Sequence, residues 1–249
     1  MKPASSPDSG HLSDQVSRYI VEYIRESGLG PGDKVPSELR TSAHLQISRG
    51  IVREAYRSLR AAGILETANG FAPRVGQLSN KAVLQILQHG LSTQQATVED
   101  VLDLRTSIEI RAAELAALKR APYHIAALRS EMAGFEKAKR NCDTWVESDL
   151  RFHSIIGEAS GNPFFMILAS ALRESLAVSM RTGFNRRTSA EEIDQLVDTH
   201  RRIANSIIKG DAAGAKRHMT THFREAREAI IGPSPAETAR RPRRKAAAR

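Results

Sequence analysis

The sequence has few of the features that mark secreted or membrane proteins. It contains a single cysteine, Cys142, which leaves no partner for a disulfide within the chain. No apolar run approaches the roughly 18 residues of a membrane-spanning helix, and residues 1–10 lack the apolar segment of a secretory signal. These absences argue against a disulfide-stabilised secreted domain. They favour a protein of the reducing cytoplasm with no membrane partner.

Aromatic residues are also scarce, at 5% of the 249 residues, whereas alanine and leucine are plentiful. This composition favours helices. Hydrophobic residues make up 41% and charged residues 26%, which is enough apolar material for a core and too mixed in sign for global disorder. The length corresponds to one large domain or two smaller ones.

The net charge of +9 is unevenly distributed along the chain. Residues 232–249 carry six basic side chains against one acidic side chain, so more than half of the surplus lies in this Pro/Ala/Arg-rich stretch. Because it lacks apolar periodicity, we expect a disordered basic tail that is attracted to polyanions. A solubilising tail is an equally good interpretation, so charge alone does not establish nucleic-acid binding.

Residues 11–78 combine three short helical patterns with one hairpin signal. The expected helices run over residues 13–28, 37–44 and 48–62; Ser13 and Ser48 suit N-caps, and Pro36 with Ser37 starts the second helix. Asn69 and Gly70 lie between two short runs of β type, 64–67 and 71–75, which indicates a hairpin. This order predicts a winged helix-turn-helix, preceded by a polar, disordered tail over residues 1–10.

The pattern after Gly76 is helical throughout. The expected helices cover residues 81–89, 98–119, 123–140, 144–160, 163–182, 190–209 and 212–230. Thr97 and Asp100 have the spacing of a capping box. Long helices with short loops predict an antiparallel bundle over residues 79–231. The expected fold class is therefore mainly α, with an N-terminal winged helix-turn-helix, a C-terminal all-α bundle and a tail over 232–249.

Four arginines of the third expected helix recur on one face. Arg49, Arg53, Arg57 and Arg60 follow one another at helical spacing, and apolar residues supply the side that packs. Guanidinium groups along one face of a capped helix suit the major groove of double-stranded DNA, where they reach phosphates and guanine edges. A solvated surface face is the alternative for the arginines alone. The neighbouring short helix and hairpin favour a DNA-reading unit.

The motifs around this helix resemble those of a known family. Residues 30–38 (GPGDKVPSE), 47–49 (ISR), 52–55 (VREA) and 62–65 (AGIL) are similar to the N-terminal domain of the GntR family of bacterial transcription regulators. The resemblance implies that a homodimer binds operator DNA. Ser48, Arg49 and Arg53 match the DNA-contacting stretch, Gly70 matches the wing glycine, and Ser37, Arg40 and Arg57 are further candidates. The chain departs from the family at Leu39, where an arginine is usual, and at Thr41, where an apolar residue is usual.

Three histidines and one aspartate lie in apolar stripes of three expected helices. Asp149 and His153 are one turn apart on the first, and His200 and His222 lie on the two others. Helical bundles build metal sites from such facing side chains, and imidazole with carboxylate suits Zn²⁺, Ni²⁺, Mn²⁺ or Fe²⁺. Hydrogen-bonded core histidines remain the alternative on spacing alone, and His218 is a rival ligand.

The same region resembles the FCD effector domain of the FadR branch of the GntR family. The similar motifs are residues 149–153 (DLRFH), 159–163 (ASGNP), His200 with Ile203, 210–211 (GD) and 222–223 (HF). The resemblance implies a helical domain that senses a small ligand, often a carboxylic acid, at a bound divalent metal. It implies Asp149, His153, His200 and His222 as the metal ligands, with zinc as the expected ion.

Arg105 is the candidate effector-binding residue. It shares a helix face with apolar residues and precedes Glu109 by one turn. A surface ion pair, which contributes little, is one interpretation. An inward guanidinium that binds a carboxylate through two hydrogen bonds is the other. The family has an arginine here in a similar Leu-Arg-x-x-x-Glu stretch, matched by residues 104–109, which favours the second interpretation.

Together these features predict a cytoplasmic bacterial regulator with no catalytic residues. In this hypothesis a repressor's affinity for its operator is controlled by a small organic acid bound at a metal ion. Three alternatives stay open. The ion itself is the signal, or the Asp/His set serves a helical-bundle metalloenzyme, or the basic tail drives general DNA binding. No His-Glu-x-x-His motif supports the enzyme.

Overall fold

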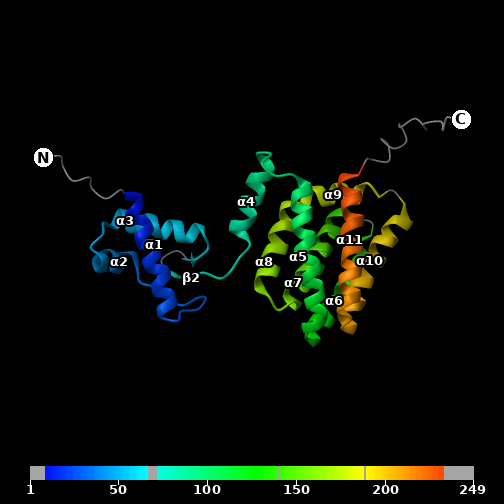
Figure 1. Cartoon of the computed structure of the whole chain (residues 1–249), viewed down its shortest axis with the longest axis horizontal. Helices are drawn as coiled ribbons and strands as arrows, with labels where there is room; N and C mark the ends of the chain where they lie inside the picture. Colours follow the sequence, from blue (N-terminus) through cyan, green and yellow to red (C-terminus); the bar gives the residue numbers. More distant parts are fainter. Residues whose placement is uncertain (1–8, 67–71, 140, 188, 233–249) are drawn as a thin grey trace, which may run out of the picture. The chain divides into compact units, whose positions relative to one another are not determined.

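The computed structural model describes residues 9–66, 72–139, 141–187 and 189–232. The chain divides into two compact units, Met1–Ala82 and Val83–Arg249 (Figure 1). The expected wing glycine Gly70 and the tail residues 233–249 lie outside the described residues. Each unit has its own buried core, so each is described by itself.

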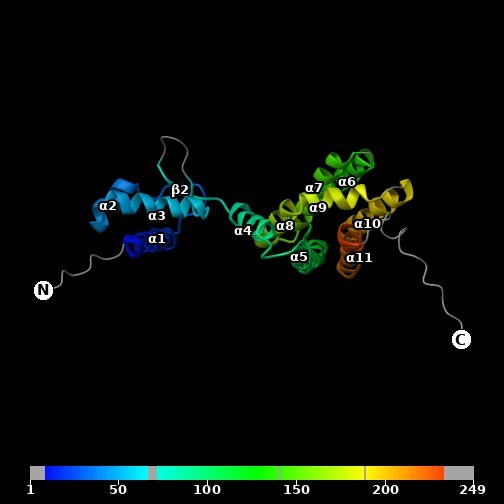
Figure 2. The same ribbon diagram turned by 90° about the horizontal axis from the view of Figure 1, so that it is seen from above.

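The N-terminal unit contains three helices and a short antiparallel pair of strands. Its elements are α1 (Ser9–Glu26), α2 (Glu38–Leu45), α3 (Arg49–Ala61), β1 (Leu65–Glu66) and β2 (Arg74–Val75). Helix α3 packs along α1 and against α2, as Figures 1 and 2 show. Val16, Ile20, Val52, Ala55 and Tyr56 are fully buried between these helices. Their helical spacing explains why one face of α3 packs inward and leaves the other free.

Ser48 caps α3 as expected, and Ser37, at the expected start of α2, caps that helix. The Ser37 hydroxyl accepts a hydrogen bond from the Arg40 amide, and the Ser48 hydroxyl accepts one from the Ile51 amide. Ser13 is not a cap, because α1 begins at Ser9 and Ser13 lies inside it. Residues 9–13 contain no proline, so nothing in their sequence prevents α1 from beginning before Ser13.

Thr41 and Tyr56 form a buried polar contact between α2 and α3. The hydroxyl oxygens of the two residues are 2.8 Å apart, and the Tyr56 hydroxyl also donates to the Pro36 carbonyl at 2.6 Å. The hydroxyl of Thr41 therefore has a partner although it is 1% exposed. This bond explains how a polar residue occupies a core position of α2.

The C-terminal unit is helical in all its named elements. They are α4 (Lys81–Ser92), α5 (Val98–Lys119), α6 (Pro122–Ala138), α7 (Cys142–Ala159), α8 (Pro163–Ser175), α9 (Ala177–Asn185), α10 (Ala190–Lys209) and α11 (Ala212–Ile231). Figures 1 and 2 show α11 running alongside α5, and α7 packs against α5, α6 and α8. The expected fold class, mainly α with a helical C-terminal bundle, is confirmed.

Local sequence signals account for most of these helix ends. Thr97 and Asp100 form the expected capping box of α5. Gly210 ends α10 with φ of 81°, a left-handed conformation that glycine adopts at low cost, and Asp211 caps α11. These residues mark the start of α5, the end of α10 and the start of α11.

One expected helix is wrong. Residues 163–182 were expected to be continuous, but α8 ends at Ser175 and α9 begins at Ala177, with a bend of 63°. Leu176 has φ of −102° and ψ of 8°, outside the helical range, and neither glycine nor proline marks the place. Within the described residues, no single helix is long and apolar enough to cross a membrane; only α8 and α9 taken together would be, by length and composition.

Candidate metal centre and nucleic-acid interface

The four residues expected to bind metal meet at one point of the C-terminal unit. Asp149 and His153 come from α7, His200 from α10 and His222 from α11. One ligand atom of each lies within 4.8 Å of the corresponding atoms of the other three, and all four side chains are buried. Their helices converge there because α10 and α11 pack as a pair and α5 joins that pair to α7.

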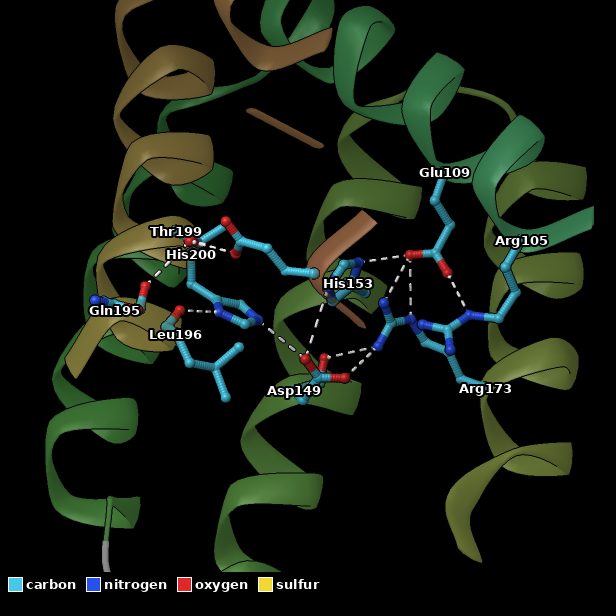
Figure 3. A network of polar contacts seen from close by, with 10 residues as sticks. Arg105, Glu109, Asp149, His153, Arg173, Gln195, Leu196, Thr199 and His200 are labelled. Carbon is cyan, nitrogen blue, oxygen red and sulfur yellow. Dashed lines mark hydrogen bonds and ion pairs between the residues drawn. The ribbon is translucent and has the colours of Figure 1, made fainter. Parts of the chain in front are cut away.

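The hydrogen bonds of His200 leave one lone pair facing a carboxylate. Its Nδ1 lies 2.8 Å from the Leu196 carbonyl, which only accepts, so the neutral ring carries its proton on Nδ1. Its Nε2 then presents a lone pair to Oδ1 of Asp149, 3.0 Å away (Figure 3). Two acceptors at this distance need a positive charge between them, either a proton or a metal ion.

The other two imidazoles carry buried nitrogen atoms without partners. Nδ1 of His153 lies 2.5 Å from Oε2 of Glu109, and its Nε2 lies 3.7 Å from Oδ1 of Asp149. Among the described residues, Nδ1 of His222 and both ring nitrogens of His153 make no hydrogen bond of normal geometry, although Nδ1 of His153 contacts Glu109. A buried nitrogen without a partner is costly, and coordination of a cation relieves that cost. The residues present therefore fit a divalent ion.

The protonation states also suit a cation. Burial lowers the pKa of His153 to about 4, and the nearby Arg173 contributes. Burial likewise lowers the pKa of His222 well below its usual value, with His200 and His153 adding to the effect. Burial alone would raise the pKa of Asp149, but Arg173 and His153 lower it well below its ordinary range. Two neutral imidazoles and an ionised carboxylate are the forms that bind metal.

A second layer of charged residues surrounds the four. Arg173 of α8 is 1% exposed and bonds Asp149 through Nη1, while its Nη2 donates to Oε2 of Glu109 at 2.8 Å. Nε of Arg105 donates to Oε1 of Glu109 at 3.0 Å, and Figure 3 shows both guanidinium groups beside Glu109. The Arg105–Glu109 pair is therefore buried, and the surface-pair interpretation is wrong.

Arg173 is the functional-site residue that the sequence reasoning missed. It follows the buried Ala169 by one turn in a helix that is otherwise apolar on that face. An arginine at helical spacing in an apolar stripe is unusual, since charged side chains are rarely fully buried unless paired. The position of Arg173 in this apolar stripe was the sequence signal that it is buried and paired. His218 lies outside the four-residue cluster, so the rival ligand is not supported by the geometry.

A small chamber opens beside the cluster. Its volume is about 50 Å³, and its lining includes Arg105, Asp149 and His222 together with Trp145 and Arg187. A wider outer cleft of about 310 Å³ shares Arg187 with it, along with Leu196 and Ala229. Nε of Arg105 is taken by Glu109, which leaves the four N–H donors of its terminal nitrogens. The chamber therefore brings the candidate effector residue and the candidate metal ligands together.

The exposed face of α3 carries the arginines expected to contact DNA. Arg49, Arg53 and Arg57 are exposed, as is Arg40 on α2. Arg53 and Arg57 make solvent-exposed ion pairs with Glu38 and Glu54, at 3.9 and 3.1 Å, which a phosphate can displace at small cost. The geometry leaves these guanidinium groups free to reach a polyanion.

Arg60 differs from the other three. Its side chain is only 33% exposed and pairs with Glu38 of α2 at 3.4 Å. The spacing placed it on the same face, but near the C-terminal end of α3 it holds α2 against α3 instead. Leu39, at the position where the family usually has an arginine, is 56% exposed and leaves Arg40 as the exposed cation of α2.

Comparison with known families identifies both units. The FCD domain family matches residues 100–225, and the family of bacterial regulatory proteins called gntR matches residues 12–75. The chain belongs to the GntR family and carries an FCD domain. It is therefore a DNA-binding transcription regulator of the GntR/FCD type, and not an enzyme by the names of its family and relatives.

Relatives of this GntR/FCD protein cover most of its length. It is 27% identical to the HTH-type transcriptional regulator LutR of Bacillus subtilis over 214 residues, which are 84% of this chain and 96% of LutR. It is also 27% identical over 216 residues to the HTH-type transcriptional repressor NanR of Salmonella newport, covering 85% and 82% of the two chains. A solved GntR structure from Streptococcus agalactiae shares its fold, with a TM-score of 0.66, 23% identity, and coverage of 87% of this chain and 99% of the other.

Proposed function

We propose that this regulator is a repressor whose operator binding is controlled by a small carboxylate effector at a divalent metal ion. The observation that carries the proposal is the chamber, in which Arg105 lies beside Asp149 and His222. The operator would be read by α3 through Arg49, Arg53 and Arg57, with Ser37, Arg40, Ser48 and Gly70 as further contacts. Two copies would present two such helices to the half-sites of double-stranded DNA in the bacterial cytoplasm.

Asp149, His153, His200 and His222 would hold the ion. One carboxylate and three imidazoles suit Zn²⁺ foremost, and also Ni²⁺, Mn²⁺ and Fe²⁺. When bound, the ion supplies a Lewis-acid centre that attracts a carboxylate. The Leu196 carbonyl would keep the His200 ring oriented through its hydrogen bond with Nδ1, and Glu109 would contact Nδ1 of His153 from the side away from Asp149.

Arg105 would grip the effector's carboxylate. Its guanidinium is held at Nε by Glu109 and lies over the Phe223 ring, with Cζ 5.2 Å from the ring centroid. Both contacts limit the rotamers available to the side chain, so little entropy is lost when the terminal nitrogens bind a ligand. The chamber is small, which favours an acid of few carbon atoms.

Two further observations support the repressor assignment and the response to a ligand. The NanR relatives are named repressors. A ligand changes the operator affinity only if it binds one arrangement of the two DNA-binding units better than another. The chamber is lined by five helices, α5, α7, α9, α10 and α11, so a ligand inside it contacts most of the bundle at once.

The proposal is tested by operator release. The wild-type protein selects its operator from a random DNA pool, and fluorescence anisotropy follows binding of that DNA to zinc-loaded protein. Short carboxylic acids should release the DNA. Arg105→Gln should keep operator affinity and zinc content but lose release, whereas Arg111→Gln on the exposed side of α5 should behave as wild type. Release that survives both Arg105→Gln and removal of the ion would contradict the proposal.

The same assay separates the metal-sensing alternative. If zinc alone shifts the operator affinity and no acid changes it further, the ion is the signal. The four buried ligand atoms within 4.8 Å of one another make this the second candidate.

A further inference from the structure

Arg187 is a half-buried cation at the junction of the inner chamber and the outer cleft. It lines both cavities. Its Nη1 donates to the Gly183 carbonyl at 2.6 Å, which is a neutral partner. Within the part of the chain that the structure describes, no carboxylate forms a direct ion pair with its guanidinium, although Glu192, Glu225 and Asp149 lie near enough to favour its charge. A partly desolvated charge that lacks a direct ion pair is a place where a ligand's anion gains affinity.

The nearby carboxylates are held by other groups or lie outside the chamber. Glu225 accepts a hydrogen bond from the Thr199 hydroxyl at 3.0 Å. Glu192 accepts a hydrogen bond from the Ser189 backbone amide at the start of α10. Glu192, Glu225 and Glu228 line the outer cleft, whereas Asp149 is the acid that lines the inner chamber. The acidic rim disfavours anions that stay outside, and the two arginines favour anions that reach the inside.

The charges buried around the cluster balance before any ion binds. Glu109 and Asp149 carry two negative charges, and Arg105 and Arg173 carry two positive charges, all in side chains that are at most 6% exposed. A divalent ion adds two positive charges to this buried group. An uncompensated buried charge is strongly unfavourable, so the loaded site favours a ligand that carries two negative charges over a ligand that carries one.

We propose that Arg187 is a specificity-determining residue that receives the second carboxylate of a small dicarboxylate, whose first carboxylate lies at Arg105 and the cluster. The proposal rests on the proposed function and names its ligand class. The two arginines line one chamber together with Asp149 and His222, so a ligand of a few carbon atoms contacts both. A monocarboxylate of the same length leaves Arg187 without an anion.

Trp145 provides a direct readout of ligand binding. It is the chain's single tryptophan, it lines the chamber, and its ring centroid lies 5.4 Å from Phe184 and 5.6 Å from His200. Zinc is not expected to quench its fluorescence, because the ion has no redox chemistry. Titrations of zinc-loaded, full-length protein use matched pairs of acids, propionate with malonate and butyrate with succinate. Zinc content is measured for every variant.

We expect one or both diacids to bind about tenfold or more tightly than the matched monoacid. This is the affinity ratio that one additional charge-assisted hydrogen bond provides. Arg187→Gln should remove most of this preference and leave only the part that the positive charge of the loaded site supplies, while monoacid affinity and zinc content stay unchanged. Unchanged monoacid binding also shows that the variant is folded. Arg187→Lys should restore part of the preference. Arg202→Gln, which removes an exposed charge from α10, should keep all of it.

Two results would overturn the proposal. Wild-type protein without diacid preference would do so, and so would a preference that Arg187→Gln leaves intact. In both cases the proposed function survives if the monoacids still bind in an Arg105-dependent manner. If the zinc-loaded protein binds none of the four acids, this proposal and the carboxylate-effector function both fail.

Discussion

Nη2 of Arg173 on α8 lies 2.8 Å from Oε2 of Glu109 on α5, although both side chains are almost completely buried. The same guanidinium bonds Asp149 on α7 through Nη1. One arginine thus joins three helices and holds a candidate metal ligand together with the carboxylate that orients His153. Removing one partner of a buried pair leaves an uncompensated charge, which is costlier than the net value of the pair.

We therefore expect Arg173→Met to be strongly destabilising. The loss should be about 3–5 kcal/mol in the free energy of unfolding, because Glu109 and Asp149 would remain buried without their cation. Urea unfolding monitored through Trp145 measures it in the C-terminal unit. Arg181→Met is the matched control, because its pair with Asp143 of α7 leaves the two side chains 46% and 75% exposed and should contribute at most about 1 kcal/mol. Equal losses in the two variants would refute the prediction.

Tyr56 should make the N-terminal unit sensitive to alkaline pH. Burial raises its pKa to about 12, against 10.0 for an exposed tyrosine, while the bond from Thr41 acts in the opposite direction. Between these values the unfolded chain has lost the proton and the folded chain has kept it. The contribution of protonated Tyr56 to the free energy of unfolding is therefore complete below pH 10. It is lost as the pH rises toward 12, and the loss is roughly 2–3 kcal/mol at most.

Tyr56→Phe isolates this effect. At pH 8 the variant should be less stable than wild type by about 1–2 kcal/mol, because Thr41 and the Pro36 carbonyl lose their partner. Near pH 11.5 the difference should shrink or reverse, which circular dichroism during urea unfolding will show. Tyr123→Phe, an exposed tyrosine of the other unit, is the control. A difference independent of pH between 8 and 11.5 would be inconsistent with the raised pKa.

Metal content should depend on His200 and not on His218. We expect purified protein to hold about one divalent ion per chain and His200→Ala to lose most of it, since four ligands hold an ion far better than three. Elemental analysis after dialysis measures the ion, and thermal unfolding with and without a chelator measures the stabilisation it provides. His218→Ala should retain the ion. Metal-free wild-type protein with an undiminished ligand response would mean that the four residues are structural.

Operator binding should depend on the exposed arginines of α3. Arg49→Ala and Arg53→Ala should abolish specific binding in the anisotropy assay without changing the helical circular dichroism signal. If each arginine contacts a phosphate, each loss should reduce the slope of binding against salt concentration by about one. Arg25→Ala, whose side chain is 72% exposed on α1, is the control. Full binding by both α3 variants would place the DNA interface elsewhere.

The sequence predicted those parts of the fold that local signals determine. Thr97 with Asp100 and Gly210 with Asp211 fixed helix ends within one residue, because capping and left-handed glycine are local chemistry. The four candidate ligands could be grouped because each lies in an apolar stripe, which places it toward the interior. Their convergence within 4.8 Å is a property of how α7, α10 and α11 pack, which spacing along a single helix does not contain.

The remaining features depend on contacts between distant elements. Leu176 leaves the helical range without a glycine or proline, so nothing local marked the end of α8. Arg60 turns toward Glu38 rather than outward, because α2 packs beside that end of α3. Arg173 was overlooked because its partners, Glu109 and Asp149, come from two other helices.

The bend at Leu176 has a consequence for how ligand choice can change. A straight continuation of α8 would carry residues 177–187 up to about 16 Å further along its axis, whereas the bent chain turns Met180, Gly183 and Phe184 toward the chamber. None of these three residues belongs to the ion cluster or to the charged layer around it. Substitutions in α9 therefore reshape the chamber without changing the candidate metal ligands, which makes this short helix the place to alter which ligand the chamber accepts.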